Sequence, residues 1–218
     1  MTNYLAPLIA ALLTGATPLY ASSAAVVPAA TPAKTTSSTP ATAPANAPAA
    51  PGGIRYTQAA SGNSLEFSFV QADAANQGVF RQFTTELTYD EKNLAASTLK
   101  VTVQVGSLDT RDGDRDETLK GADLLDVARY PAAQYQASSF AKRADGQLEA
   151  VGKLTLRGVT RELRLPMVLK PTAAGLELSG EATIHRLDYG VGQGDWKATD
   201  MVGNDVRLKY RVALSRAR

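Results

Sequence analysis

An alternation of apolar and polar residues recurs along most of the chain, and it constrains the fold more than any other feature. Every second residue is apolar in the segments 65–69 and 99–105. This period of two is that of a β-strand with one apolar and one polar face. The other segments with this pattern are 83–89, 132–142, 154–156, 163–169, 176–184 and 206–214, with a further candidate at 54–58. The sequence therefore predicts eight or nine strands.

The links between these segments are short and contain turn-forming residues. They are 90–93, 144–146, 157–160 and 172–175. Links this short join antiparallel neighbours. Several of the strands are longer than is typical of a sandwich, and long strands in meander order favour closure into an up-and-down barrel. The predicted fold is therefore all-β, an eight-stranded antiparallel barrel.

The interior of such a barrel has two possible states. Eight strands enclose a space that is either filled by side chains or able to hold one small ligand. Small residues among the inward candidates, Thr85, Gly180 and Ala182, fit a tunnel, but they fit close packing against large neighbours equally well. The residues alone leave both states open.

The first 53 residues differ in composition from the rest. An apolar run at 5–13 precedes small residues at 21–24, as in a secretory signal peptide. Residues 22–53 are nearly all Ala, Pro, Thr and Ser, which cannot form a core. We predict a signal peptide at 1–21, a disordered linker at 22–53 and a folded domain at 54–218, exported to the periplasm.

The sequence disfavours attachment of the first 53 residues to a membrane or to a lipid. An uncleaved membrane anchor needs roughly 20 apolar residues, and here Pro7, Gly15 and Pro18 interrupt the run. The chain contains no Cys, which excludes lipid attachment through a Cys and also any disulfide. The domain is therefore expected to be stabilised by its core alone.

Several classes of function are disfavoured by the residues present. The net charge is only +2 and no run is dominated by Lys and Arg, so nothing indicates a nucleic-acid partner. His185 is the single histidine and Cys is absent, so the usual nucleophile and base pairs and a His-based metal site cannot be assembled. We expect a protein without enzymatic activity, metal or cofactor, in which His185 is a partly exposed strand residue rather than a partner of Asp188.

One polar stretch, 111–131, interrupts the strands. The carboxylates at 109–117 suggest calcium, but the expected loop Gly and final Glu are missing, and Arg111 and Arg115 neutralise part of the charge. We favour acidic residues at the start of a short helix, where the dipole and free amides stabilise them. The helical insert would lie at one end of the barrel, as a plug or as a lid, and would place there Leu124, Leu125 and Tyr130.

A second irregular stretch, 188–204, is rich in Gly and contains the only Trp of the chain, Trp196. Loops of this length inside a compact domain are usually functional or mobile. No Lys-Ser or Lys-Thr pair follows the glycines, so a phosphate-binding loop is disfavoured. We predict an aromatic-bearing rim for the mouth of the barrel.

Four segments, in the same order, resemble the YceI-like family of lipid- and polyisoprenoid-binding proteins of the bacterial envelope. They are 78–90, 105–131, 152–161 and 183–190, of which the third reads Gly-Lys-Leu-Thr-Leu-Arg-Gly-Val-Thr-Arg. Three positions depart from the family pattern: Arg157 stands where members often have His, His185 where they often have Asn, and Leu124-Leu125 where they have aromatic residues. Ligand specificity would differ if these positions contact a head group.

The resemblance implies a lipocalin-like antiparallel barrel, with the short helical insert at one end, whose interior holds a long isoprenoid or fatty amphiphile such as a quinone or a polyprenyl diphosphate. Under this hypothesis an apolar tunnel is lined by Phe67, Phe69, Phe80, Phe83, Leu99, Val101, Val103, Leu154, Leu156, Leu178 and Ile184. Its rim would be Leu124, Leu125, Tyr130, Tyr189 and Trp196, and an anionic head would meet Arg111, Arg115, Arg157 and Arg186.

The predicted function is that of a periplasmic carrier for such a lipid. The alternative is a non-enzymatic partner-binding module of an envelope redox or stress-response system, whose loops would meet an inner-membrane redox partner. A hydrolase is a third possibility, disfavoured by the missing nucleophile constellations. The sequence leaves the ligand unidentified and a homodimer open.

Overall fold

The chain folds into a β-barrel, and some strands of the barrel are divided into two segments that lie end to end. The computed structural model describes residues 52–217, and it places eleven strands in this part of the chain. They are β1 (Ile54–Gln58), β2 (Ser64–Gln71), β3 (Ala74–Phe80), β4 (Phe83–Tyr89), β5 (Thr98–Gln104), β6 (Leu108–Asp109), β7 (Ala132–Lys142), β8 (Leu148–Leu156), β9 (Val159–Pro171), β10 (Gly175–His185) and β11 (Asp205–Arg216).

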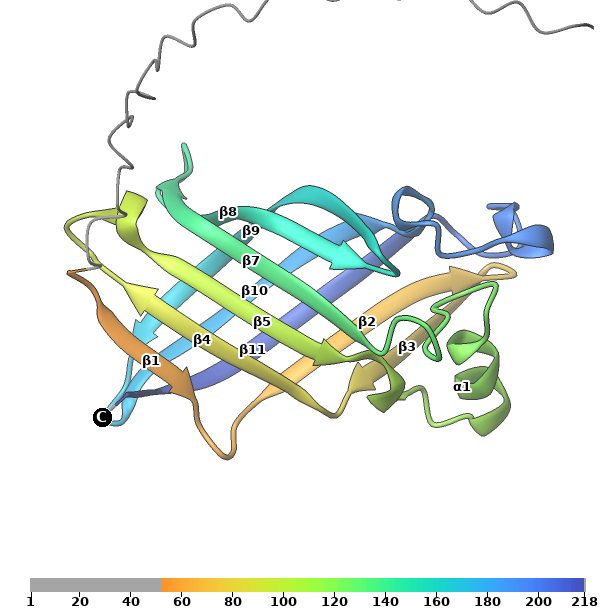
Figure 1. The fold of residues 1–218 in the computed structure, drawn as a ribbon, viewed down its shortest axis with the longest axis horizontal. Coiled ribbons are helices and arrows are strands. Elements are labelled where there is room, and N and C mark those ends of the chain that lie inside the picture. The colour runs from red at the N-terminus through yellow and green to blue at the C-terminus, as the bar shows by residue number, and fades with distance from the viewer. Residues whose placement is uncertain (1–51, 218) are drawn as a thin grey trace, which may run out of the picture. The chain divides into compact units, whose positions relative to one another are not determined.

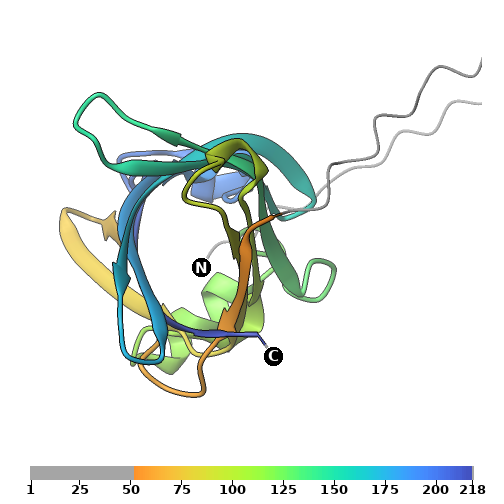
Figure 2. The ribbon, with the colours of Figure 1, turned by 90° about the vertical axis from the view of Figure 1, so that its left-hand side faces the viewer.

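Three pairs of these segments each act as one long, interrupted strand. β1 and β2 both pair with β11, and residues 59–63 loop out between them. β4 pairs with β1 and β5, whereas β3 pairs with β2 and β6. The segments therefore form eight antiparallel strands in chain order, and the pairing of β1 with β11 closes the ring, as the view along the barrel shows (Figure 1, Figure 2). The predicted eight-stranded antiparallel barrel is confirmed.

The hairpin of β2 and β3 turns on two residues, Ala72 and Asp73, which have φ values of 47° and 61°. Positive φ at both central residues is the mark of the tight turn whose twist matches that of paired strands. The period-two pattern missed β3, because its first residues, Ala74-Ala-Asn-Gln-Gly78, do not alternate between apolar and polar. The hairpin extends toward the end of the barrel that carries the insert (Figure 1).

The insert contains α1 (Gly113–Lys120). The Asp112 carboxylate accepts a hydrogen bond of 3.0 Å from the backbone N–H of Arg115, and Asp114 and Asp116 follow in the first turn. Acidic groups at a helix start satisfy free amides and interact well with the dipole, so the predicted short helix with acidic residues at its start is confirmed. The remaining helical segments are 3₁₀ turns, namely η1 (Leu94–Ala96), η2 (Val105–Ser107), η3 (Arg186–Tyr189) and η4 (Gly194–Lys197).

The end of the barrel that contains β1 is filled by side chains. Leu87, Met167 and Leu214 are each only 1% exposed, and large residues from the surrounding strands pack against them. The cluster consists of Tyr56, Leu87, Leu99, Tyr135, Ala137, Phe140, Ala150, Leu165, Met167, Leu176, Leu178, Tyr210, Val212 and Leu214. We call this half the filled end.

Two further observations bear on the predicted chain organisation. The predicted signal peptide at 1–21, and the predicted linker except for its last two residues, lie outside the described residues. Within residues 52–217, no helix is long and apolar enough to cross a membrane.

Candidate functional site

The end of the barrel opposite β1 contains a cavity of about 630 Å³. Sites for small molecules usually have volumes of about 300–1,000 Å³ and mostly apolar walls. The cavity is lined by Leu65, Phe67, Phe69, Gln71, Ala72, Ala74, Asn76, Phe80, Val103, Val105, Asp112, Asp114, Arg115, Thr118, Leu119, Leu124, Leu125, Ala133, Leu154, Leu156, Ile184, Arg186, Val191, Trp196, Val202, Val206 and Leu208. We call this half the hollow end.

Three phenylalanines form one wall of the cavity. The rings of Phe67 and Phe69 are stacked with centroids 6.2 Å apart, and the ring of Phe80 lies 5.0 Å from that of Phe67. Gly78 is required here, because a side chain at this position would collide with the Phe67 ring and with Thr110. A glycine on β3 therefore lets the aromatic wall of β2 lie flat against the neighbouring strand.

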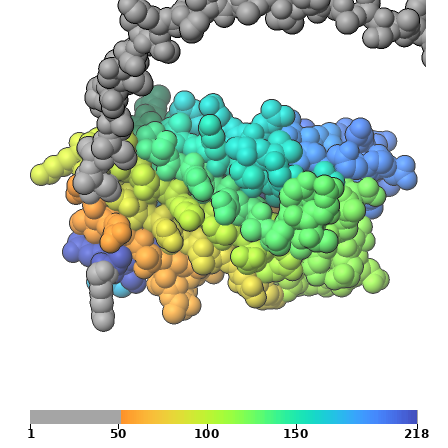
Figure 3. All heavy atoms as spheres, in the orientation of Figure 1, coloured from red at the N-terminus to blue at the C-terminus, as the bar shows by residue number. Residues whose placement is uncertain are grey.

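The rim of the cavity is polar where the hairpin of β2 and β3 faces α1. The hairpin contributes Gln71 and Asn76, whereas α1 and its cap contribute Asp112, Arg115 and Thr118. The Arg115 guanidinium lies 3.2 Å from the Asp112 carboxylate, so this pair largely cancels its own charge. In the space-filling view, α1 and the loop of η3 and η4 form the end of the molecule around this rim (Figure 3).

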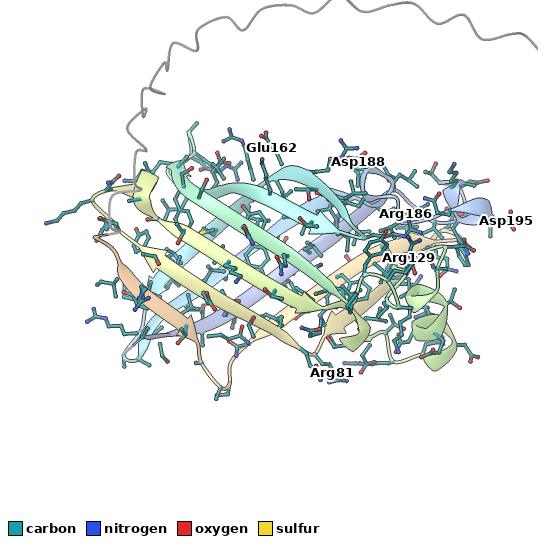
Figure 4. The ribbon with its side chains drawn as sticks, in the orientation of Figure 1. Arg81, Arg129, Glu162, Arg186, Asp188 and Asp195 are labelled. Atoms are coloured by element: carbon teal, nitrogen blue, oxygen red, sulfur yellow. The ribbon has the colours of Figure 1, made fainter. Side chains whose placement is uncertain are left out.

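Arg186 is a buried cation in the wall of the hollow end (Figure 4). It is 3% exposed, and its Nε–H donates to the carbonyl of Gly203 at 3.0 Å. Its Nη1 donates to Val191 at 2.9 Å, and its Nη2 donates to Val202 at 2.7 Å and to Ala198 at 3.3 Å. Burial lowers the pKa of this guanidinium from its ordinary value.

The partners of Arg186 are all carbonyls of the segment 191–203, which belongs to the Gly-rich loop predicted to form the rim. Within residues 52–217, Arg186 forms no ion pair with a carboxylate. Gly192 has a φ of 107°, and a side chain there would collide with Nη1 of Arg186. The backbone N–H groups of Gly192 and Gln193 donate to the carbonyl of Asp123, at 2.9 and 2.8 Å, and so join the loop to the insert.

Most of the sequence-predicted site residues come together around this cavity. The residues of the predicted tunnel that lie in the cavity wall are Phe67, Phe69, Phe80, Val103, Leu154, Leu156 and Ile184. The residues of the predicted rim and head-group site that lie in the cavity wall are Leu124, Leu125, Trp196, Arg115 and Arg186. The insert and the Gly-rich loop thus meet at one end of the barrel, which is the location predicted for the insert.

Four residues of the predicted tunnel do not line the cavity. Leu99 and Leu178 belong to the filled end, and Phe83 and Val101 pack against the same cluster. The alternation shows which side chains point inward, but it does not show how far along the barrel axis each inward residue lies.

The two tyrosines of the predicted rim also lie outside the cavity lining. The Tyr130 ring packs against Gly158, and the Arg129 guanidinium stands 5.5 Å above its centroid. Tyr189 is 3% exposed and packs behind the wall with Ile184. Burial raises the pKa of the Tyr189 phenol.

Two of the four predicted head-group arginines point elsewhere. Arg157 donates from Nη2 to the carbonyl of Ala122 at 2.6 Å, so it links the turn between β8 and β9 to the insert. Arg111 lines a separate polar groove on the outer face of β2, β3 and β11. The pKa of the Asp109 carboxyl lies below its ordinary value. The main cause is a hydrogen bond from the backbone N–H of Arg111, and the second is one from the Arg81 guanidinium.

Several lining residues were not predicted. Val206 and Leu208 alternate on β11, so the period-two pattern contained the signal for them. Leu119, Val191 and Val202 lie on α1 and in the Gly-rich loop, where no strand periodicity exists. Their position depends on how these segments fold over the end of the barrel.

His185 is a strand residue, as predicted; it ends β10 and is exposed rather than partly exposed. Its Nδ1 lies 2.9 Å from Oδ1 of Asp205, the residue opposite on β11, so its carboxylate partner is Asp205. No group of three or more His, Cys, Asp or Glu side chains within residues 52–217 is arranged to hold a metal ion.

Comparison with known proteins gives a family match over most of the barrel and relatives that match a part of it. Residues 56–214 match the family described as the YceI-like domain. Protein YceI of Escherichia coli O157:H7 is 42% identical over 88 residues, which are 40% of this chain and 46% of that protein. Protein YceI of Salmonella arizonae is 40% identical with the same coverage. The match therefore spans about half the length of these relatives.

Several solved structures resemble the barrel, including the following two. Burkholderia cenocepacia BcnA superposes with a TM-score of 0.66 and 25% identity, covering 69% of this chain and 94% of that one. A polyisoprenoid binding domain from Saccharophagus degradans, implicated in plant cell wall breakdown, gives a TM-score of 0.60 at 12% identity, covering 75% of this chain and 99% of that one. These structures share the fold of the chain.

Proposed function

Since the chain belongs to the YceI-like family, we propose that it is a periplasmic carrier that holds an isoprenoid or related long-chain amphiphile inside its barrel. The observation that carries the proposal is the cavity of about 630 Å³ at the hollow end, with its predominantly aliphatic and aromatic wall. The polyisoprenoid binding domain from Saccharophagus degradans, which has the same fold, supports the ligand class.

The energetics of burial fit such a ligand. Each buried CH₂ group contributes about 0.8 kcal/mol, so an isoprene unit contributes roughly 3 kcal/mol before the costs of association. A few units are enough for tight binding. The Phe67, Phe69 and Phe80 rings offer a continuous aromatic surface to a branched, unsaturated chain.

The charges around the cavity favour an uncharged head group. Asp112 and Asp114 balance Arg115 and Arg186 among the lining residues. Arg115 is paired with Asp112, and the guanidinium of Arg186 is engaged by four carbonyls. A diphosphate would find little unbalanced positive charge there, so a quinone fits better than a polyprenyl diphosphate.

A cavity-filling substitution tests the proposal. Leu208 lines the cavity and is only partly buried, so Leu208→Trp places an indole in the space that the ligand would occupy. Calorimetric titration of the full chain with a short-tailed isoprenoid quinone should show affinity reduced by about tenfold or more. The matched control is Val168→Trp, on the outer face of β9, which should bind as the unaltered chain does.

Unchanged binding by Leu208→Trp would mean that the cavity is not the ligand-binding site. It would favour the alternative, a non-enzymatic partner-binding module of an envelope redox or stress-response system.

One observation favours that alternative: Val70 and Met201 are exposed apolar residues, 47% and 55% exposed, at the lip of the hollow end. Their two segments are joined by backbone hydrogen bonds, since the Gly203 N–H donates to the carbonyl of Val70 and the Ala72 N–H donates to that of Met201, each at 2.9 Å. In the alternative function, the lip that contains Val70 and Met201 would contact an inner-membrane redox partner.

A further inference from the structure

The cavity stops near the middle of the barrel, at a level occupied by two tyrosines. Tyr135 on β7 pairs with Leu154, and Tyr210 on β11 pairs with Leu65; both of these partners line the cavity. One step toward the filled end on the same strands, Ala137 and Val212 are buried in the core cluster and do not reach the cavity. The tyrosines therefore lie directly beneath its floor.

Both phenols are fixed to the backbone of β9. The Tyr135 hydroxyl lies 3.1 Å from the carbonyl of Leu163 and 2.9 Å from that of Ala150 on β8. From the other side, the Tyr210 hydroxyl donates to the carbonyl of Pro166. The tyrosines are 4% and 9% exposed, so turning either ring aside would break a hydrogen bond made by a buried phenol.

The structure makes room for this arrangement at Gly180. A side chain at that position would collide with the Tyr210 hydroxyl, so the glycine on β10 lets the Tyr210 ring pass over its strand to reach β9. The two phenols also lie near one another. Burial is the largest cause that raises the pKa of Tyr135, and the neighbouring Tyr210 is the second.

The volume above this floor sets a capacity. A methylene or methyl group takes a volume similar to that of one water molecule in the liquid, about 30 Å³. A cavity of 630 Å³ therefore has room for about 20 carbon atoms, or about four isoprene units. Below the floor, Leu87, Met167 and Leu214 are each 1% exposed, as expected for close packing.

We propose that Tyr135 and Tyr210 act as a length limit, which restricts the buried part of a bound prenyl chain to about four isoprene units. This inference rests on the proposed carrier function. Leu65 and Leu154 form the surface that the chain end meets, and the tyrosines beneath hold that surface in place. Any longer tail would have to remain outside the mouth between α1 and the hairpin of β2 and β3.

A series of uncharged prenols of increasing length tests the limit on the full chain. Trp196 is the only Trp and lines the cavity, so a change in the intensity or wavelength of its fluorescence reports binding. The dissociation constant should fall by about tenfold or more with each added unit until about four units are reached, and then stop falling. Continued tightening up to eight units would overturn the length limit while leaving the carrier function in place. Failure of every prenol to bind would overturn the carrier function itself.

Substitutions at the floor should shift the limit in opposite directions. Leu65→Phe raises the floor, so the longest prenol that still gains affinity should shorten by about one unit. Tyr210→Leu removes the ring and should extend the limit, whereas the control Tyr210→Phe keeps the ring and should leave it unchanged. If Tyr210→Leu does not fold, Leu65→Phe alone decides, because an unchanged length profile in that variant would overturn the assignment of the floor.

Discussion

The two ends of the barrel are built largely from the same strands, yet one is filled and the other is hollow. At the filled end, large inward residues from the surrounding strands meet at the axis, and Leu87, Met167 and Leu214 are almost completely buried. At the hollow end, inward residues such as Leu156, Val206 and Leu208 are of similar size but only partly buried. Residue type therefore does not distinguish the two ends.

The difference lies in what covers each end. The first strand of the filled end, β1, pairs with both β4 and β11 and closes the ring tightly. At the hollow end, α1 and the loop of η3 and η4 extend the wall beyond the strands and add their own inward side chains at a distance from the axis. A cavity results where irregular segments, rather than strands, complete the enclosure.

The largest expected contrast is in the cost of shortening a leucine. Leu87→Ala at the filled end should lower the free energy of unfolding by about 3 kcal/mol, because it creates a void in close packing. Leu208→Ala at the hollow end should lower it by about 1 kcal/mol, because this side chain already borders empty space. Denaturant unfolding measures both, and equal losses would contradict the distinction between the ends.

A somewhat smaller effect is expected at Arg186, whose hydrogen bonds hold the loop that walls the hollow end. Arg186→Met keeps most of the apolar stem but removes every donor to the 191–203 carbonyls, so stability should fall by about 2 kcal/mol or more. The matched control is Arg164→Met, which breaks an exposed pair with Glu149 and should cost less than about 1 kcal/mol.

Hydrogen exchange would locate the damage in Arg186→Met. Amide protection should be lost in the loop and retained in β4, β5 and the rest of the filled end. Uniform loss of protection over the whole barrel would mean that the two ends unfold together, which would weaken the comparison between them.

The smallest expected effect concerns alkaline pH at the boundary between the two ends. Burial raises the pKa of Tyr135 and of Tyr210 above the ordinary value of about 10. The folded chain then keeps protons that the unfolded chain releases, so the free energy of unfolding is unaffected below about pH 10 and falls above it. Unfolding measured across this range should show a weaker decline in Tyr210→Phe than in the unaltered chain.

The sequence predicted the barrel well and the site in part. The strand positions and the short helix that begins with acidic residues followed from local patterns, namely a period of two and an acidic helix start. The same patterns identified Phe67, Phe69 and Leu156 as inward residues that reach the cavity. They could not separate these from Leu99 and Leu178, which have the same alternation but lie in the filled end.

What the sequence determined by itself is the face on which each strand residue lies, because the direction of successive side chains is a property of the extended backbone. Only the tertiary structure decided the height of each residue along the barrel, since that depends on the stagger between paired strands. It also decided the role of Arg186, whose carbonyl partners become neighbours only when the loop folds back over the barrel end. The cavity floor arises in the same way, because Tyr135 and Tyr210 are distant in the chain and meet only through β9.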